Sequence, residues 1–300
     1  MGKKKLDSSS PGSLGSSLGE VTAGHFKSSI EGLTRLASQH PSVRYILDVL
    51  TRLRERPYAT NVVVRGEPGT GKEGLAHTLH ELMHAEGAPL VSVSTAGRPE
   101  EVVAAELFGA GPQLKGERPV DGAVAHADGG TLVLDEVIGL SPALQRRLLE
   151  LVKHGRYHRE FEDRERRSEV GVIVITDGDL KAEVAAGRFR HDLYHKLARL
   201  DLVLPPLRER PEDVPGAARW MANRVRLDRG LPATVELEGE PHGEADAIVI
   251  EKDAIEALRQ HRWPGNFREL EIVVERALLL FGNGKRVTAD DVQHALAEPT

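Results

Sequence analysis

The chain of 300 residues carries 40 Lys or Arg, 46 Asp or Glu and no Cys, and its formal net charge is -6. Without cysteine it cannot form disulfides, thiolate metal sites or a cysteine nucleophile. No run of about 18 apolar residues and no apolar signal segment occur, so we expect no membrane span and a cytoplasmic location. The mildly acidic balance gives no electrostatic reason to expect nonspecific nucleic-acid binding.

The first residues differ in composition from the rest of the chain. Residues 1–30 are rich in Ser and Gly and hold few large apolar side chains. Such a segment cannot bury enough surface to offset the entropy of ordering, so we expect a flexible leader. From residue 31 the pattern is globular, and helical spacing begins after the start signal Pro41-Ser42.

Short apolar runs alternate with segments of helical periodicity in the first two thirds of the chain. This alternation predicts an α/β fold with a parallel sheet covered by helices on both faces. The runs are Asn61–Arg65, Leu90–Val93, Thr131–Leu134, Val172–Ile175 and Leu200–Leu204.

The pattern changes after Pro205-Pro206, where strand-like runs stop and helical spacing dominates. We therefore predict an α/β domain over residues 31–206 and an all-helical subdomain over residues 207–300. Within the second part, Glu236–Asp246 is acidic and contains glycine, which predicts a solvated insertion loop. The helical segments are Val214–Val225, Ala254–Arg262, Phe267–Leu280 and Ala289–Leu296.

A glycine-rich turn follows the first predicted strand and precedes a predicted helix, which is the context of a phosphate-binding loop, or P-loop. Its glycines let backbone N–H groups point at phosphate oxygens, and its lysine reaches the β and γ phosphates. Glu73 occupies the eighth position, where the general motif has Ser or Thr to hold magnesium. We predict nucleotide binding by Gly66, Glu67, Pro68, Gly69, Thr70, Gly71, Lys72 and Glu73.

Two adjacent carboxylates end the apolar strand over Thr131–Leu134. In a sheet parallel to the P-loop strand, Asp135 would arrive beside the phosphates to organise magnesium, and Glu136 could polarise water. The order of the two motifs and their separation of about 70 residues favour this interpretation over an ordinary solvated strand end.

For two further motifs we favour a structural interpretation over a functional one. The segment His80-Glu81-Leu82-Met83-His84 matches the zinc-protease motif. Leu90 stands where an extended motif has its third His, so a solvated helix tail is the better interpretation. In Arg156–Arg167 the acids alternate with the bases, which favours a solvated hairpin or loop over a nucleic-acid patch.

Six blocks of sequence occur in a fixed order. They are Gly66–Glu73, Glu106–Gly109, Gly129–Glu136, Phe189–Tyr194, Pro205–Arg210 and Trp263–Leu270. Over nearly all of Gln39–Pro299 the chain thereby resembles the AAA+ domain of bacterial enhancer-binding proteins, the ATPases that activate sigma-54 RNA polymerase. The resemblance implies an AAA+ P-loop NTPase fold with a C-terminal helical lid, ATP and Mg²⁺ as ligands, and a ring, hexameric in that family. The family also carries Glu at the position of Glu73.

The resemblance also implies roles for single residues. Asp177 matches the sensor of the γ-phosphate, where the family usually has Asn, and an acid there would alter binding or hydrolysis. Arg190 matches an arginine finger that reaches the neighbouring subunit's nucleotide. Lys196 stands at the second finger and lacks the fork of Arg. Arg268 matches the lid arginine that contacts nucleotide in cis, and Ser94 replaces the Asn that couples phosphate sensing to the catalytic glutamate.

The chain departs from the family after Gly109. The family has a loop there with the motif Gly-Ala-Phe-Thr-Gly-Ala, whose aromatic tip contacts sigma-54, whereas Ala110–Asp121 holds neither Phe nor Thr. The family also appends a helix-turn-helix beyond the lid. The chain stops soon after Leu296, so we expect no sequence-specific DNA binding.

These observations leave three functions open. The first is an ATP-hydrolysing ring that regulates transcription through sigma-54 RNA polymerase or another protein client. The second is a nucleotide-dependent binding switch with reduced hydrolysis, because Asp177, Lys196 and Ser94 are altered. The third is a regulatory subunit that inserts into rings of an intact relative.

Overall fold

The structure is a computed structural model, and it describes residues 38–112, 118–232, 234–239, 247–281 and 285–298. The flexible leader expected over residues 1–30 lies outside the described residues. No helix in the described part of the chain combines the length and apolar character needed to cross a membrane.

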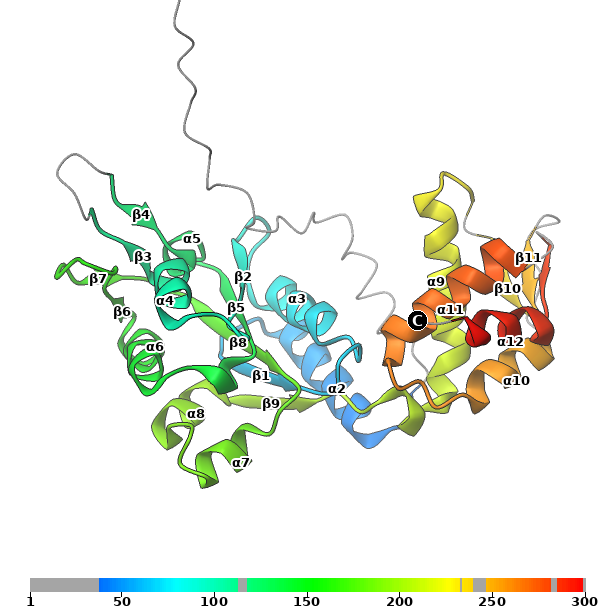
Figure 1. Ribbon diagram of the computed structural model, residues 1–300, viewed down its shortest axis with the longest axis horizontal. Coiled ribbons are helices and arrows are strands. Elements are labelled where there is room, and N and C mark those ends of the chain that lie inside the picture. The colour runs from blue at the N-terminus through cyan, green and yellow to red at the C-terminus, as the bar shows by residue number, and fades with distance from the viewer. Residues whose placement is uncertain (1–37, 113–117, 233, 240–246, 282–284, 299–300) are drawn as a thin grey trace, which may run out of the picture.

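A five-stranded parallel sheet forms the centre of the first part, in the order β2-β5-β8-β1-β9 (Figure 1). The predicted α/β fold with a parallel sheet is confirmed, and each strand lies within a residue or two of its predicted run. The strands are β1 (Val62–Arg65), β2 (Leu90–Ser94), β5 (Thr131–Asp135), β8 (Gly171–Thr176) and β9 (Leu200–Val203).

Successive side chains of each strand point to opposite faces of the sheet, and helices bury both faces. Val63 and Val174 belong to one apolar cluster, and Val64 and Ile175 belong to the cluster on the other face. The first cluster includes residues of α4 (Glu100–Phe108), α5 (Ala123–His126), α6 (Pro142–His154), α7 (Leu180–Ala185) and α8 (His191–Leu197); the second includes residues of α2 (Pro41–Glu55) and α3 (Lys72–Met83).

Two short antiparallel pairs stand outside the sheet. They are β3 (Gly109–Ala110) with β4 (Val120–Asp121), and β6 (Arg156–Tyr157) with β7 (Arg166–Arg167). The second pair confirms a hairpin within Arg156–Arg167, but the stretch is not solvated throughout, because Tyr157 and Arg159 are buried. Of the loop after Gly109, residues 113–117 lie outside the described residues.

The second part, called the lid below, packs its helices around a separate apolar cluster that includes the fully buried Trp263. The Trp263 indole donates to the carbonyl of Leu258 at 2.9 Å, which satisfies its only polar group. The lid helices are α9 (Val214–Asp228), α10 (Lys252–Gln260), α11 (Asn266–Arg276), which continues as a π-helix over Ala277–Phe281, and α12 (Ala289–Ala297).

The prediction of an all-helical lid was wrong in one respect. A parallel sheet of β10 (Val235–Leu237), β11 (Ile248–Ile250) and β12 (Arg286–Val287) lies beside the helices. Val235, Ile248 and Ile250 are buried in the lid core. Glu236 and Leu237 of the predicted insertion loop therefore belong to a strand, while residues 240–246 lie outside the described residues.

Candidate active site

The P-loop connects β1 to α3 at the carboxyl end of the sheet. Gly71, with φ of 97°, precedes the first turn of α3, and no side chain caps that turn. The first amides of the helix are therefore available to an anion. Lys72 Nζ donates to the carbonyls of Gly66 at 2.7 Å and Glu67 at 3.1 Å. An ammonium has three donors, so one remains for a phosphate oxygen.

Gly69 is the point where the P-loop meets the lid. Its φ is 77°, a left-handed conformation that favours glycine, and an added Cβ would lie 2.3 Å from the carbonyl oxygen of Gly265. Its own carbonyl accepts the backbone N–H of Phe267 at 2.9 Å. The same hypothetical Cβ lies 3.3 Å from Cβ of the exposed Arg268. The structure therefore brings Arg268 to the P-loop.

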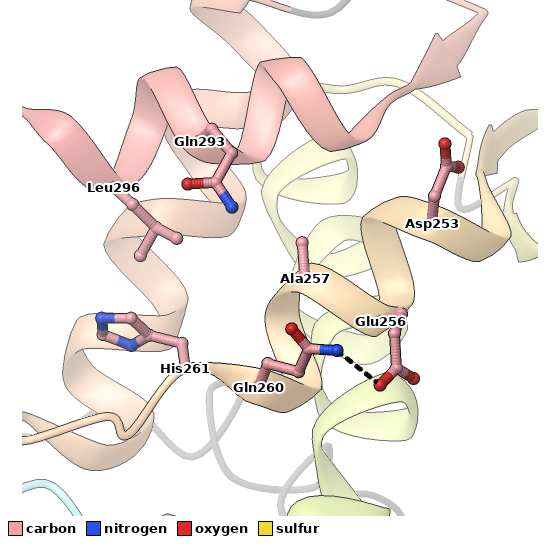
Figure 2. A pocket seen from close by; sticks show the side chains of 7 residues that line it. All are labelled: Asp253, Glu256, Ala257, Gln260, His261, Gln293 and Leu296. Atoms are coloured by element: carbon pink, nitrogen blue, oxygen red, sulfur yellow. Dashed lines mark hydrogen bonds between the residues drawn. The ribbon is translucent and has the colours of Figure 1, made fainter.

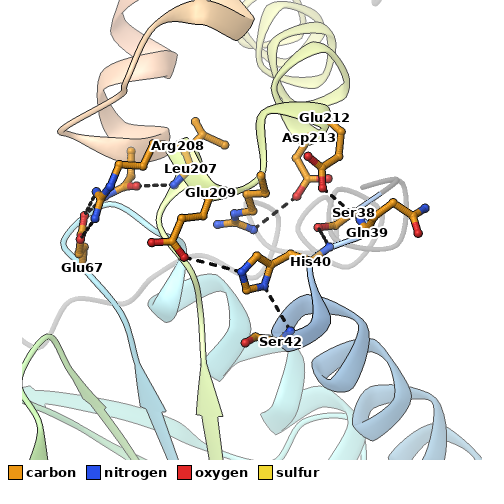
Figure 3. Close-up of polar contacts among 12 residues, drawn as sticks. Ser38, Gln39, His40, Ser42, Glu67, Leu207, Arg208, Glu209, Glu212 and Asp213 are labelled. Carbon is orange, nitrogen blue, oxygen red and sulfur yellow. Dashed lines mark hydrogen bonds and ion pairs between the residues drawn. The ribbon is translucent and has the colours of Figure 1, made fainter.

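Glu67 links the P-loop to the lid through its side chain. Both its carboxylate oxygens accept from Arg208, at 2.6 and 2.8 Å (Figure 3). This hydrogen bond lowers the pKa of Glu67. Asn266 adds bonds to the Glu67 carboxylate at 3.4 Å and the Pro68 carbonyl at 3.0 Å, and accepts the Leu207 N–H at 2.8 Å. Residues Glu67, Arg208 and Asn266, the P-loop latch, were not predicted from the sequence.

A buried arginine also contacts the P-loop. Arg210 is fully buried, donates to the Thr70 carbonyl at 3.3 Å and stacks over the Phe267 ring at 4.7 Å. Burial lowers its pKa to about 10. It therefore stays charged at neutral pH beside Asp213, whose nearest oxygen is 3.8 Å away.

The segment before α2 joins the same region. His40 caps α2 by accepting the Ser42 N–H at 3.2 Å, and its other ring nitrogen lies 3.7 Å from a carboxylate oxygen of Glu209 (Figure 3). Gln39 N–H donates to Glu212 at 3.2 Å. Residues far apart in the sequence thus converge where the lid begins.

Asp135 and Glu136 stand at the end of β5, facing the P-loop residues. Burial raises the pKa of Asp135, and the carboxylate of Glu73 raises it further, while Lys72 lowers it. Two carboxylates beside one ammonium leave an excess of negative charge, which fits a magnesium ion. Asp135 and Glu73 are therefore the residues here that could hold a divalent cation beside Lys72.

Glu136 is held by the end of β8. Its carboxylate accepts the Asp177 N–H at 2.9 Å and the Thr176 hydroxyl at 3.2 Å, and its own φ of 61° is left-handed. Burial raises its pKa; the Asp177 N–H opposes this shift and the Asp177 carboxylate reinforces it. Ser94, which replaces the Asn that couples phosphate sensing to the catalytic glutamate in the family, forms a side-chain hydrogen bond with Asp135. Thr176 is a hydrogen-bond partner of Glu136 that was not predicted from the sequence.

Of the predicted finger residues, Lys196 lies on α8, and Arg190 is the N-cap residue just before that helix. The Arg190 guanidinium pairs with both oxygens of Asp192, at 2.7 and 3.0 Å, and its N–H donates to Gln145 at 2.9 Å. Lys196 is half-buried, and its carbonyl accepts from Asn61 at 3.0 Å. None of these contacts reaches the P-loop of the same chain. Among the described contacts, neither Arg190 nor Lys196 therefore reaches the nucleotide site of its own chain.

The His80–His84 segment is not a solvated tail, because His80 is buried. Its Nδ1 lies 2.9 Å from the Thr131 hydroxyl, its ring stacks on His84, and burial lowers its pKa to about 4. Among the described residues, no group of three or more His, Asp or Glu side chains is arranged to hold a metal ion.

A groove of about 430 Å³ lies between α10 and α12 (Figure 2). One of its polar contacts is internal, since Gln260 donates to Glu256 at 3.0 Å. None of its lining residues belongs to the P-loop or its partners, so we do not assign the nucleotide to it. They are Asp253, Glu256, Ala257, Gln260, His261, Gln293 and Leu296.

Comparison with known families and proteins gives a consistent result. The family described as "Sigma-54 interaction domain" matches residues 36–203, and the "AAA+ ATPase lid domain" matches residues 208–300. The Nif-specific regulatory protein of Azotobacter vinelandii is 35% identical over 254 residues, which are 84% of this chain and 45% of that protein. The anaerobic nitric oxide reductase transcription regulator NorR of Enterobacter sp. (strain 638) is 40% identical over 242 residues, or 78% of this chain and 44% of that protein.

Solved structures of NtrX are similar to this chain in fold. NtrX from Brucella abortus in complex with ATP has a TM-score of 0.72 at 27% identity and covers 92% of this chain and 59% of that one. The complex with ADP has a TM-score of 0.71 at 26% identity, covering 92% and 62%. The chain spans less than half the length of the two curated relatives above.

Proposed function

Since the chain belongs to the sigma-54 interaction domain family, followed by an AAA+ lid, we propose that it hydrolyses ATP as a ring and thereby regulates transcription. The single observation that carries this proposal is the meeting of the P-loop, Asp135 and Glu136 at one edge of the sheet. By resemblance the ring is hexameric, the client is sigma-54 RNA polymerase or another protein, and the location is the bacterial cytoplasm. The ATP-bound NtrX structure supports nucleotide binding.

We also propose the division of the chain at residues 206 and 207. Leu204 belongs to an apolar cluster of the sheet, and Leu207 belongs to that of the lid. The proline pair between them fits a boundary where contacts change from one core to the other.

In the proposed mechanism, water attacks the γ phosphorus and the bond from that phosphorus to the oxygen of the leaving ADP breaks; the proton lost by the water passes to solvent. Glu136, positioned by Thr176 and the Asp177 N–H, orients the water. Lys72 offsets the developing charge. Asp135 and Glu73 would hold magnesium, which when bound neutralises charge on the β and γ oxygens. Arg190 completes the site from the next subunit, and Arg268 contacts the nucleotide from the lid.

Phosphate release measured against protein concentration tests the proposal. We expect activity per subunit to rise with concentration, because rings complete the site, and to vanish in Glu136→Gln. Bound ATP without phosphate release at any concentration would contradict the ATPase proposal. It would favour the nucleotide switch, an alternative supported by Asp177 beside Glu136 and by Ser94 bonding to Asp135.

Asp177→Asn is expected to shift the acid limb of the turnover profile to lower pH. Glu136 must be ionised to orient water, so the rate falls as pH drops through its raised pKa. Removing the Asp177 carboxylate removes one cause that raises this pKa, while the backbone N–H that binds Glu136 stays. The measurement is kcat from pH 5 to 8. Glu169→Gln, an exposed change elsewhere, is the control, and an unchanged acid limb in Asp177→Asn would refute the assigned coupling.

The P-loop latch is expected to support nucleotide affinity as one unit. Arg208→Gln and Glu67→Gln each break the Glu67–Arg208 pair, so each should weaken ATP binding by about fivefold, and the double variant by no more than either single one. Titration with a fluorescent ATP analogue measures this. Additive losses in the double variant would show that the two side chains act separately.

A further inference from the structure

Two hairpins that are separate in sequence are joined at one end of the α/β part (Figure 1). The Gly111 N–H donates to the Glu160 carbonyl at 2.7 Å, and the Glu160 N–H donates to the Gly109 carbonyl at 2.8 Å. Ala110 therefore pairs with Val120 on one side and bridges to Glu160 on the other. The β3–β4 and β6–β7 hairpins are thus joined by backbone hydrogen bonds, and together they are called the hairpin surface below.

Ion pairs fix this surface. The side chain of Arg159 is 6% exposed, and its guanidinium pairs with Asp121 of the first hairpin and Glu162 of the second. Arg166 binds Glu162 at 3.0 Å, and Arg147 pairs with Glu160. A network with a buried member holds the backbone between its residues in one conformation. The residue inside this network, at position 161, is therefore presented rigidly.

That residue is Phe161, and both its backbone and its side chain are unfavourable for the isolated chain. Its φ is 60°, in the left-handed region that bulky residues rarely adopt, and the residue is 70% exposed. The phenyl ring is not buried and the backbone conformation is unfavourable, so Phe161 at this position does not stabilise the isolated chain. Such strain is retained where it serves a function. Among the described residues of the two hairpins, Val120 is the other exposed large apolar side chain, at 64%.

We propose that Phe161 is the apolar anchor that inserts into a pocket of the protein client. This inference rests on the proposed function, since it names the contact to the client of that ATPase. A rigid aromatic side chain loses little entropy on binding and is typical of interface hot spots. The described part of Ala110–Asp121 offers no aromatic side chain, so Phe161 supplies it from the neighbouring hairpin.

The surroundings favour a protein over a nucleic acid as the partner. Three arginines of the β6–β7 hairpin pair with carboxylates: Arg156 with Glu165, Arg159 with Asp121 and Arg166 with Glu162. A phosphate backbone requires unpaired positive charge. A polypeptide with an apolar pocket and a polar rim fits an exposed phenyl ring framed by paired charges.

The test uses Phe161→Gly, because glycine adopts φ of 60° without strain and the substitution removes the benzyl side chain. The probe is purified sigma-54, with the full chain held in its ATP-hydrolysis state by ADP and aluminium fluoride. We expect the variant to fold, to keep its basal phosphate release and melting temperature or raise the latter, and to bind sigma-54 at least about tenfold more weakly. Leu227→Ala, which removes an exposed apolar side chain from the lid, is the control.

Wild-type affinity in Phe161→Gly would overturn the inference while leaving the ATPase proposal intact. Phosphate release without any binding of sigma-54 by the unaltered chain would overturn the client contact as well. Absence of phosphate release would instead be a failure of the proposed function. Equal weakening by Leu227→Ala would show that exposed apolar area in general, and not the anchor, carries binding.

Discussion

Lys72→Ala is expected to bind ATP about 100-fold more weakly or not at all. The lysine ammonium is held by two P-loop carbonyls, at 2.7 and 3.1 Å, with one donor left for a phosphate. Losing a charge-assisted contact to a phosphate costs about 3 kcal/mol, which is roughly two decades in affinity. Calorimetric titration with ATP measures the loss.

Lys252→Ala is the control for this variant. Lys252 is exposed in the first turn of α10, so its loss removes the same charge from the surface of the lid. We expect it to bind ATP normally. ATP affinity in Lys72→Ala equal to that of this control would refute the P-loop assignment.

Arg190→Ala is expected to bind ATP normally and to lose turnover by about 10³-fold. An arginine that reaches the γ-phosphate from a neighbouring subunit stabilises charge only in the transition state, so its removal affects the rate and not the binding. In this chain Arg190 contacts Asp192 and Gln145 and no P-loop residue. The measurements are ATP affinity and steady-state phosphate release.

The matched control is Arg188→Ala, two residues away. The Arg188 guanidinium is also exposed and also pairs with a carboxylate, Glu183, through two hydrogen bonds. A general loss of surface charge would affect both variants alike. Equal turnover in Arg190→Ala and Arg188→Ala would contradict the shared-site account.

Much of the fold was predictable because its signals are local. The run Val62–Val64 is β-branched and ends at a glycine turn, so strand, P-loop and helix follow from a dozen residues. The strands β10 and β11 were missed because three residues each are too short for a pattern, and β10 lies in an acidic stretch. Burial in the lid core, which depends on distant residues, decides their conformation.

The site was predictable only in part for a related reason. The P-loop residues, Asp135 and Glu136 sit within continuous motifs. In contrast, the pair Glu67 and Arg208 joins residues 141 positions apart, and the bond from Arg210 to the Thr70 carbonyl spans 140. Charge pairing over such separations leaves no periodic signal in one sequence, and neither does the left-handed backbone of Phe161.

Mixing two inactive variants tests the central claim, a catalytic site shared between subunits, most directly. Glu136→Gln retains the finger, and Arg190→Ala retains the glutamate, so in mixed rings about a quarter of the interfaces combine an intact glutamate with an intact finger. We predict that phosphate release, absent from each variant alone, reappears in a one-to-one mixture whose co-assembly is shown by size exclusion. Mixed rings that release no more phosphate than the separate variants would contradict the account.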